Sequence, residues 1–303
     1  MTDTGGAESS GKLRVAGCYL TRIIGSVISH LNKTPVDIAD NLAADRFIIE
    51  RDFLIIETTV KKIIVGFAKP LSCHNCRMNN FCLPLGLDAD DLDKLEELIQ
   101  RKKPLQPREG VFFSGDPFTS IYAVRSGSIK SFCIDPDGRE QVTGFYFSGE
   151  IFGWDGLADE QYQNTAIALE TTSVCEIPYE QLDDLGNSIP SIQKHMMRLI
   201  SREINADQRL IALLAGNSAQ QKIASLLLSI SDRLVKQKLS STRLWLPMSR
   251  GEISNYLGLT VETVSRVLGH FQRKKYLAVN KKEIEILDKQ ALRDLMLSAE
   301  EVE

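Results

Sequence analysis

The segment CHNCRMNNFC places three cysteines, Cys73, Cys76 and Cys82, within ten positions of a chain of 303 residues. Cysteine thiolates bind zinc and iron, and this spacing allows all three to reach one centre. Such sites normally take four ligands, so another part of the chain must supply the fourth. Structural zinc with a further cysteine or histidine and an iron–sulfur cluster with four cysteines both remain compatible with the spacing.

The remaining cysteines, Cys18, Cys133 and Cys175, are the other sulfur ligands that the chain offers. Cys133 lies in an alternating segment that predicts a β-strand, where a free cysteine is commonly a small core residue. Cys18 lies in a segment without a clear structural pattern. Cys175 is expected at the end of a strand shortly before Pro178, facing a loop. Spacing alone selects none of them over a histidine.

A second group of candidate residues lies in the basic segment 243–282, which carries eight Lys and Arg residues against two Glu residues. A local positive face is an electrostatic feature of surfaces that bind polyanions. Ser249 followed by Glu252 predicts a capping box at the start of a helix, and Gly258 predicts the tight turn that ends it. A second helix is expected over 261–274. The two short helices and their turn predict a helix-turn-helix.

The second of these helices has one apolar and one polar face, and the polar face is suited to the major groove of DNA. Arg266 can donate two hydrogen bonds to guanine, Glu262 can accept one from cytosine, and Ser265 can contact either type of base. Arginines outside this face are better suited to phosphates. The residues expected to bind DNA are Arg250, Thr260, Glu262, Thr263, Ser265, Arg266 and Arg273.

The sequence pattern predicts the helices and strands that position the cysteines and the residues expected to bind DNA. Short β-rich runs separated by glycine fill 103–178 and predict a sandwich or barrel. An acidic start and helical spacing predict a short helix over 88–101, ahead of the sheet. The segment YLAVNKKEIEILD, after the helix-turn-helix, alternates like the hairpin of a winged helix. The expected fold class is α+β.

A long helix is expected over 188–215, with Pro190 in its first turn. Apolar side chains repeat there at alternating spacings of three and four, as in a coiled-coil seam. Packing on the protein's own β-domain is one interpretation, and a dimer helix is the one we favour. Asp207 interrupts the seam, so like charges would oppose pairing and leave a marginal dimer suited to a switch. The expected interface residues are Met197, Ile200, Ile204, Asp207, Ile211 and Leu214.

Composition and motifs exclude several classes of protein. The longest stretch without a charged residue is 210–221, shorter than the roughly 18 apolar residues of a membrane span, so no membrane partner is expected. The first residues lack the pattern of a secretory signal, which predicts a cytoplasmic protein with reduced thiols. We see no nucleophile–base arrangement and no phosphate-binding glycine loop, so an enzyme is not expected.

Six long motifs lie between about residues 71 and 290. They are CHNCRMNNFCLP, IYAVRSGSIKSF, QVTGFYFSGEIFGWD, LETTSVCEIP, MMRLISREINADQ and RGEISNYLGLTVETVSRVLGHFQ. Together these motifs resemble the fumarate and nitrate reduction regulator (FNR) family, the oxygen-sensing branch of the cyclic AMP receptor protein superfamily.

The resemblance implies an oxygen-responsive transcription regulator that activates anaerobic and represses aerobic metabolism genes. It implies an oxygen-labile [4Fe-4S] cluster on Cys73, Cys76, Cys82 and Cys175, with Asp207 keeping the cluster-free form monomeric. It also implies a homodimer, RNA polymerase as a partner, and double-stranded DNA with inverted TTGAT half-sites. A zinc-stabilised binding domain without a sensing role is the alternative from another class.

The resemblance also implies an order of domains, and the sequence departs from the family in two places. The cyclic AMP phosphate anchor, an Arg-Ser or Arg-Thr pair, is replaced by Asn164-Thr165, so no cyclic nucleotide ligand is expected. The stretch before Cys73 is longer than the family's usual leader, which a start near Leu54 or Val60 would explain. The expected parts are an N-terminal extension (1–70), a cysteine segment (71–87), a β-roll of the cyclic-nucleotide-binding jelly-roll type (88–187), a dimerisation helix (188–216) and a winged helix-turn-helix domain (217–303).

Overall fold

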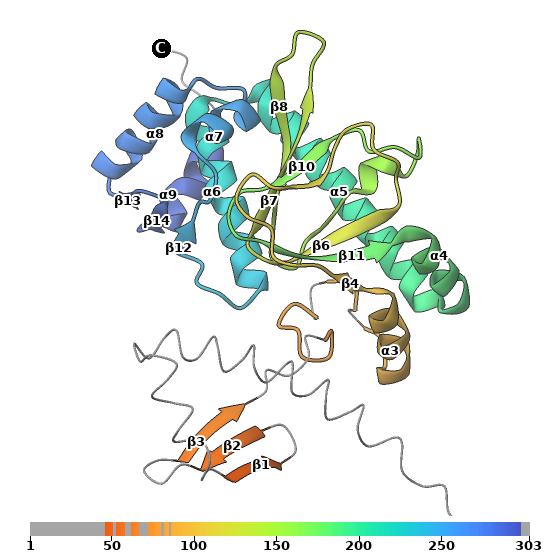
Figure 1. Ribbon diagram of the computed structural model, residues 1–303. Coiled ribbons are helices and arrows are strands. Elements are labelled where there is room, and N and C mark those ends of the chain that lie inside the picture. The colour runs from red at the N-terminus through yellow and green to blue at the C-terminus, as the bar shows by residue number, and fades with distance from the viewer. Residues whose placement is uncertain are drawn as a thin grey trace, which may run out of the picture. The chain divides into compact units, whose positions relative to one another are not determined.

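The computed structural model describes residues 46–50, 53–57, 62–66, 72–79, 82–84 and 86–297, in two units that divide after Pro70 (Figure 1). The described part of the first unit is an antiparallel sheet of three strands in sequential order. Its strands are β1 (Arg46–Glu50), β2 (Phe53–Glu57) and β3 (Lys62–Gly66). Cys18 lies outside the described residues.

The second unit begins with a β-roll of two four-stranded antiparallel sheets, as the glycine-punctuated runs predict. One sheet has the spatial order β5 (Gly110–Phe112), β10 (Thr165–Ala168), β7 (Ser128–Ile134) and β8 (Glu140–Phe147). The other has the order β4 (Gln100–Arg101), β11 (Ser173–Pro178), β6 (Ser120–Ser126) and β9 (Ile151–Phe152). Gly127 joins β6 to β7 with φ +85°, where a Cβ would meet the Thr171 carbonyl at 2.7 Å, so the turn requires glycine.

Aromatic side chains fill the interior of the β-roll. Phe112 stacks on Tyr162 with ring centroids 3.9 Å apart, and Phe152 lies within 6.0 Å of both Phe112 and Tyr122. All four residues are at most 7% exposed. Because these rings occupy the space between the sheets, side chains and not a ligand make up this core.

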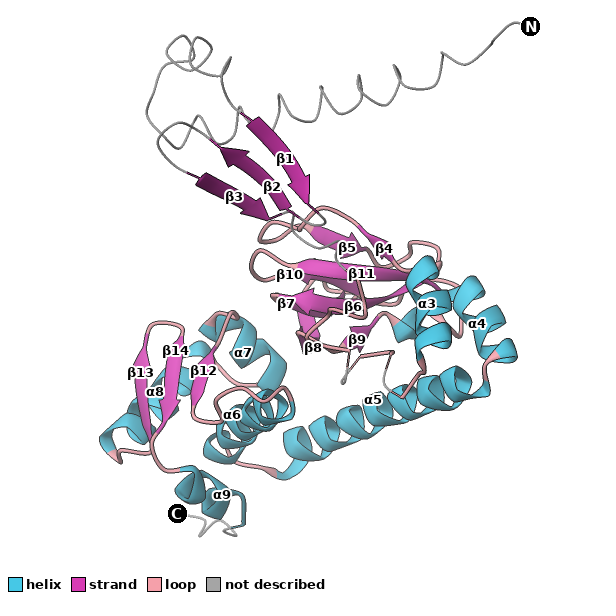
Figure 2. Ribbon diagram, turned by 90° about the horizontal axis from the view of Figure 1, so that it is seen from below, coloured by secondary structure: helices cyan, strands magenta, loops and turns pink. Residues whose placement is uncertain are grey.

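Helices at one end of the roll close a second core. The helix expected over 88–101 is confirmed as α3 (Ala89–Leu98), and it is followed later in the chain by α4 (Tyr179–Ser188) and α5 (Pro190–Gly216). Figure 2 shows α5 as a long rod that runs from α4 towards the C-terminal helices. The buried residues that these helices share with the cysteine segment and the sheet include Leu83, Leu95, Ile121, Ile177, Leu182, Ile192 and Met196.

The C-terminal part is a winged helix-turn-helix. Capping boxes start α6 (Ala219–Lys236) and α7 (Arg250–Leu257), and Gly258, with φ +61°, ends α7. Thr260 caps α8 (Val261–Arg273), one residue shorter than predicted, because Lys274 is its C-cap. A three-stranded sheet forms the wing, and its first strand was not anticipated. The remaining elements are β12 (Arg243–Trp245), β13 (Leu277–Asn280), β14 (Glu283–Ile286) and α9 (Lys289–Leu297).

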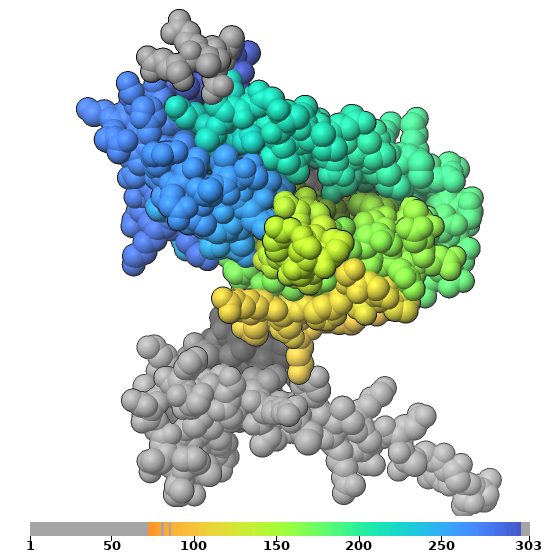
Figure 3. Space-filling model, turned by 90° about the horizontal axis from the view of Figure 1, so that it is seen from above, coloured from red at the N-terminus to blue at the C-terminus, as the bar shows by residue number. Residues whose placement is uncertain are grey.

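Strand β8 of the roll packs into the core of this C-terminal domain. Val142 and Phe145 belong to the same buried cluster as the α7 and α8 side chains, and the Phe145 ring meets the Tyr256 ring edge-on at 5.0 Å. In the space-filling view, the yellow-green hairpin of β7 and β8 abuts the blue atoms of the C-terminal domain (Figure 3). The two domains therefore share apolar surface in addition to α5.

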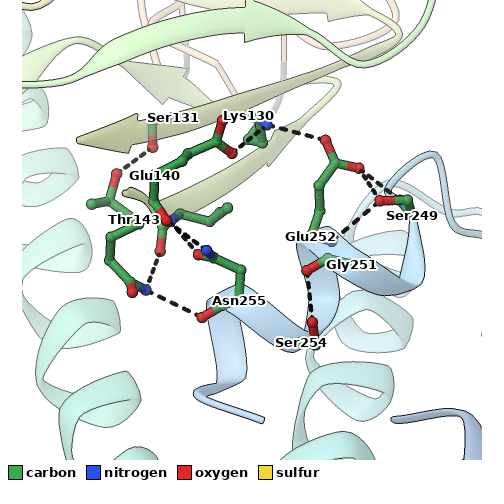
Figure 4. Close-up of polar contacts among 11 residues, drawn as sticks. Lys130, Ser131, Glu140, Thr143, Ser249, Gly251, Glu252, Ser254 and Asn255 are labelled. Atoms are coloured by element: carbon green, nitrogen blue, oxygen red, sulfur yellow. Dashed lines mark hydrogen bonds and ion pairs between the residues drawn. The ribbon is translucent and has the colours of Figure 1, made fainter. Parts of the chain in front are cut away.

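Polar contacts fix helix α7 against the same hairpin (Figure 4). The Asn255 side chain accepts a hydrogen bond from the Val142 N–H and donates one to the Glu140 carbonyl, both at 2.6 Å. Lys130, only 4% exposed, pairs with Glu140 at 2.7 Å and with Glu252 of α7 at 3.1 Å. A buried ammonium needs both carboxylates, so the β-roll holds the first helix of the helix-turn-helix in a defined orientation.

Replacing Asn255 with alanine is expected to lower the free energy of unfolding by about 1–3 kcal/mol, because the partly buried Val142 N–H loses its acceptor. Urea denaturation measures this change. Asn205→Ala is the control, since that exposed amide only donates to Ser201 of its own helix. Equal urea midpoints for the two variants would show that the Asn255 contact contributes nothing.

Candidate metal centre and DNA-binding surface

Four cysteines line one small cavity between the cysteine segment and the sheet. Cys73, Cys76 and Cys82 come from residues 72–84, and Cys175 comes from strand β11. The rest of the lining is mainly apolar and includes Leu83, Ile99, Ala123 and Ile177. Residues that are 93 positions apart in the sequence thus converge on one space.

Consecutive turns bring the three clustered cysteines to this cavity. The Cys76 N–H donates to the Cys73 carbonyl at 3.2 Å, and the Asn79 N–H donates to the Cys76 carbonyl at the same distance. The Cys82 N–H then donates to the Met78 carbonyl at 2.9 Å. Because each turn reverses the chain, the segment curls and its thiols face inward.

Cys175 reaches the cavity from the middle of a strand, not from the strand end facing a loop that we expected. It pairs with Ala123 of β6 on one side and with Arg101 of β4 on the other. Strand β11 continues to Pro178. Proline is tolerated at the end of a strand, because the only hydrogen-bonding group that it lacks is the backbone N–H. The fourth thiol is therefore held by a sheet, a more rigid support than a loop.

Burial favours the neutral thiol at Cys73, Cys82 and Cys175 when no cation is bound. It raises the pKa of Cys82 to about 12, helped by the electrostatic influence of Cys175 and Cys76. Burial also raises the pKa of Cys175, and burial followed by a hydrogen bond with Glu96 raises the pKa of Cys73. A bound cation would favour the thiolate form of these three cysteines, since metal binding and thiol deprotonation are linked.

The donor set is compatible with an iron–sulfur cluster, which takes four cysteine thiolates. Within the part of the chain that the structure describes, no three His, Cys, Asp or Glu residues come close enough to hold one metal ion. A [4Fe-4S] cluster takes one thiolate on each iron, so its ligands lie further apart than those of a single ion. Four cysteines line the cavity, and no His, Asp or Glu is among its lining residues.

Cys133 does not belong to this group. It is half-buried in β7, opposite Gln141 of β8, and does not line the cavity. The sequence left Cys133 and Cys175 as alternatives for the fourth ligand. Cys175 lies beside the cysteine segment, and Cys133 lies outside the cavity.

The predicted base-reading face of α8 lies on the surface. Glu262 and Arg266 are exposed, and Ser265 is half-buried and accepts a hydrogen bond from Arg250 Nη1 at 3.1 Å. Arg273 is exposed at the end of the helix. This face leaves Arg266 free to reach base edges, whereas Arg250 is held beside Ser265.

Two threonines from the predicted DNA-binding set have a structural role at the start of α8. The Thr260 hydroxyl accepts a hydrogen bond from the Thr263 N–H at 3.2 Å and donates one to the Thr263 hydroxyl at 3.1 Å. These bonds cap the helix, so both side chains stabilise the N-terminus of α8.

Helix α5 separates a packed face from an open one. Ile192 and Met196 are buried against the roll, as the alternative interpretation required. The predicted seam lies on the other side, where Met197, Ile204 and Ile211 are 52–66% exposed. Ile200 and Leu214 are partly buried and Asp207 is exposed, which leaves an apolar stripe interrupted by a carboxylate.

The fold matches known domain families and solved structures. The Cyclic nucleotide-binding domain matches residues 102–188, and the Crp-like helix-turn-helix domain matches residues 221–295. The structure of FixK2 from Bradyrhizobium japonicum aligns with a TM-score of 0.60 at 26% identity, over 67% of this chain and 99% of that one. These matches define a class of DNA-binding regulator with a β-roll ahead of the helix-turn-helix.

Sequence relatives narrow this class. The chain is 44% identical over 225 residues to the Fumarate and nitrate reduction regulatory protein of Escherichia coli K12, covering 74% of this chain and 90% of that protein. It is 46% identical over 216 residues to the Transcriptional activator protein anr of Pseudomonas aeruginosa, covering 71% and 88%. The chain belongs to the FNR family of the CRP/FNR superfamily, as the motifs predicted. It is a transcription regulator that binds DNA and not an enzyme.

No helix in the described part of the chain is long and apolar enough to cross a membrane.

Replacing Arg266 with alanine is expected to weaken binding to the target DNA by about 1–3 kcal/mol and to relax the base preference. Arg273→Ala is the matched control, because loss of a phosphate contact should weaken binding to all sequences and reduce the salt slope by about one. Anisotropy titrations with target and scrambled duplexes at several salt concentrations measure both. Unchanged discrimination in the Arg266 variant would remove this residue from the reading face.

Proposed function

We propose that this protein is an oxygen-responsive regulator of anaerobic metabolism, with a [4Fe-4S] cluster held by Cys73, Cys76, Cys82 and Cys175. The observation that carries the proposal is the single cavity lined by these four thiols. The names of the relatives, which refer to fumarate and nitrate reduction, support the anaerobic role. When bound, the cluster supplies the positive charge that these thiolates need and a centre that reacts with oxygen.

The surroundings of the cysteines support a route from this cavity to α5. His195 of α5 donates a hydrogen bond from Nε2 to the Cys82 carbonyl at 3.3 Å. Leu83, one residue further on, shares a buried core with Ile192 and Met196 of the same helix. Because this core is close-packed, moving the cysteine segment changes the support of α5.

The open face of α5 supports regulation through dimerisation. In a symmetric dimer the stripe around Ile204 would meet its own copy, and the two Asp207 carboxylates would oppose each other. Although Asp207 is exposed, desolvation by its neighbours raises the pKa of its carboxyl. A homodimer places two α8 helices about one DNA turn apart, which suits inverted TTGAT half-sites. RNA polymerase is the further partner of such a DNA-bound dimer.

The β-roll supports sensing without a cyclic nucleotide. Asn164 stands where cyclic AMP-binding relatives have an arginine, and its amide donates to Asp155 at 2.9 Å. Its carbonyl oxygen accepts from the Thr143 hydroxyl at 2.9 Å. The interior beside it contains the Phe112 and Tyr162 stack. Asn164 therefore provides no positive charge for a phosphate, and the stacked rings of Phe112 and Tyr162 provide no space for a purine.

Protein purified without oxygen is expected to be brown, with about four iron and four sulfide per chain, and to bleach in air. Iron and sulfide assays with absorbance spectra measure this. Cys175→Ala should abolish the cluster, whereas the matched control Cys133→Ala should retain it. Colourless protein containing zinc would contradict the proposed function.

Replacing Asp207 with alanine is expected to give a dimer that binds DNA in air, because the like charges across the seam are removed. Sedimentation velocity and a DNA-binding assay, both in air, measure this. Asp294→Ala, which removes an exposed carboxylate on α9, should stay monomeric. A monomeric Asp207 variant would refute the role of the seam.

A further inference from the structure

Arg101 touches both parts of the proposed cluster site. Strand β4 pairs with β11 so that Arg101 lies directly opposite Cys175. Its Nη2 donates a hydrogen bond to Cys73 Sγ at 3.6 Å. One side chain thus links the strand that carries the fourth cysteine to the segment that carries the other three.

Glu96 of α3 holds Arg101 in this position. Its Oε1 accepts from Arg101 Nη1 at 2.7 Å, and its Oε2 accepts from the Cys73 backbone N–H. The Arg101 and Glu96 side chains are 21% and 22% exposed, so the pair is largely shielded from water. A planar guanidinium can bind a carboxylate through one nitrogen and a sulfur through the other, which lysine cannot do.

The orientation of this pair puts its positive end towards the cavity. Arg101 lines the cavity, whereas Glu96 does not line it and contacts both the backbone N–H and the thiol of Cys73. A cluster bound by four thiolates carries net negative charge, and a nearby fixed cation stabilises that charge strongly where water is scarce. Hydrogen bonds to the sulfurs and net charge are also what set the reduction potential of such clusters.

We propose that Arg101, held by Glu96, is a positioning residue of this site: it docks the cysteine segment on β11 and offsets the negative charge of the thiolate-bound cluster. This inference rests on the function proposed above. It adds a residue outside the ligand set that determines how firmly the cluster is held and how readily it accepts an electron.

Lys102 offers a matched control beside Arg101. Its side chain is 69% exposed and pairs with Glu176 at 2.6 Å, and it does not line the cavity. Lys102→Gln therefore removes one positive charge at the neighbouring position without touching a cysteine. Arg101→Lys retains the charge of Arg101 but loses the two-pronged contact.

The test compares wild type, Arg101→Gln, Arg101→Lys and Lys102→Gln, each reconstituted with iron and sulfide under argon. Arg101→Gln should lose its cluster to a chelator about tenfold faster than wild type, the scale of a lost supporting contact. Its reduction potential should be more negative, because a positive charge and a sulfur donor are gone. Arg101→Lys should be intermediate in the rate of cluster loss, and Lys102→Gln should match wild type.

Cluster-free protein provides an independent readout. In Arg101→Gln, Glu96 loses its partner, so the Cys73 amide should exchange with deuterium faster than in wild type or Lys102→Gln. If Arg101→Gln matches Lys102→Gln in chelator rate, potential and exchange, the Arg101 proposal is overturned while the cluster function stands. If wild type takes up no iron, the proposed function itself fails.

Discussion

The burial of four thiols around one cavity is the constraint on which the rest of this structure depends. Burial raises the pKa of Cys73 and of Cys82, so both thiols favour the neutral form in that environment when no cation is bound. Arg101 and Glu96 prepare the contact between segment and strand. The same core reaches the buried face of α5 through Leu83. The cysteine segment and α5 therefore share one buried core.

The helix-turn-helix could be predicted nearly residue by residue, because its signals are local. The Ser249 capping box, the turn at Gly258 and the Thr260 cap each act within four residues. The cavity could be predicted only in part. Cys133 and Cys175 both lie in strands, and only the pairing of β11 with β4 and β6 separates them. Family resemblance supplied that choice before the structure showed its geometry.

Arg101 was missed because it opens the run RKKP, in which charged neighbours indicate a solvated surface. Its role depends on a partner in α3 and on a two-residue strand, neither of which periodicity reveals. The three residues of β12 were missed for a similar reason: a strand this short exists only because β14 pairs with it. Long, locally capped elements were predictable here, and short elements held by distant partners were not.

Because strand β8 contributes to the core of the C-terminal domain, the β-roll and that domain cannot be exchanged as independent modules. Val142 and Phe145 belong to the β-roll by sequence, but by packing they belong to the core of the C-terminal domain. A recombination point placed between the β-roll and α6 would cut through this core, even though the chain there looks like a linker. Exchange of sensory domains among relatives would then need to move the β7–β8 hairpin and helix α7 together, so these two segments are expected to evolve as a single unit.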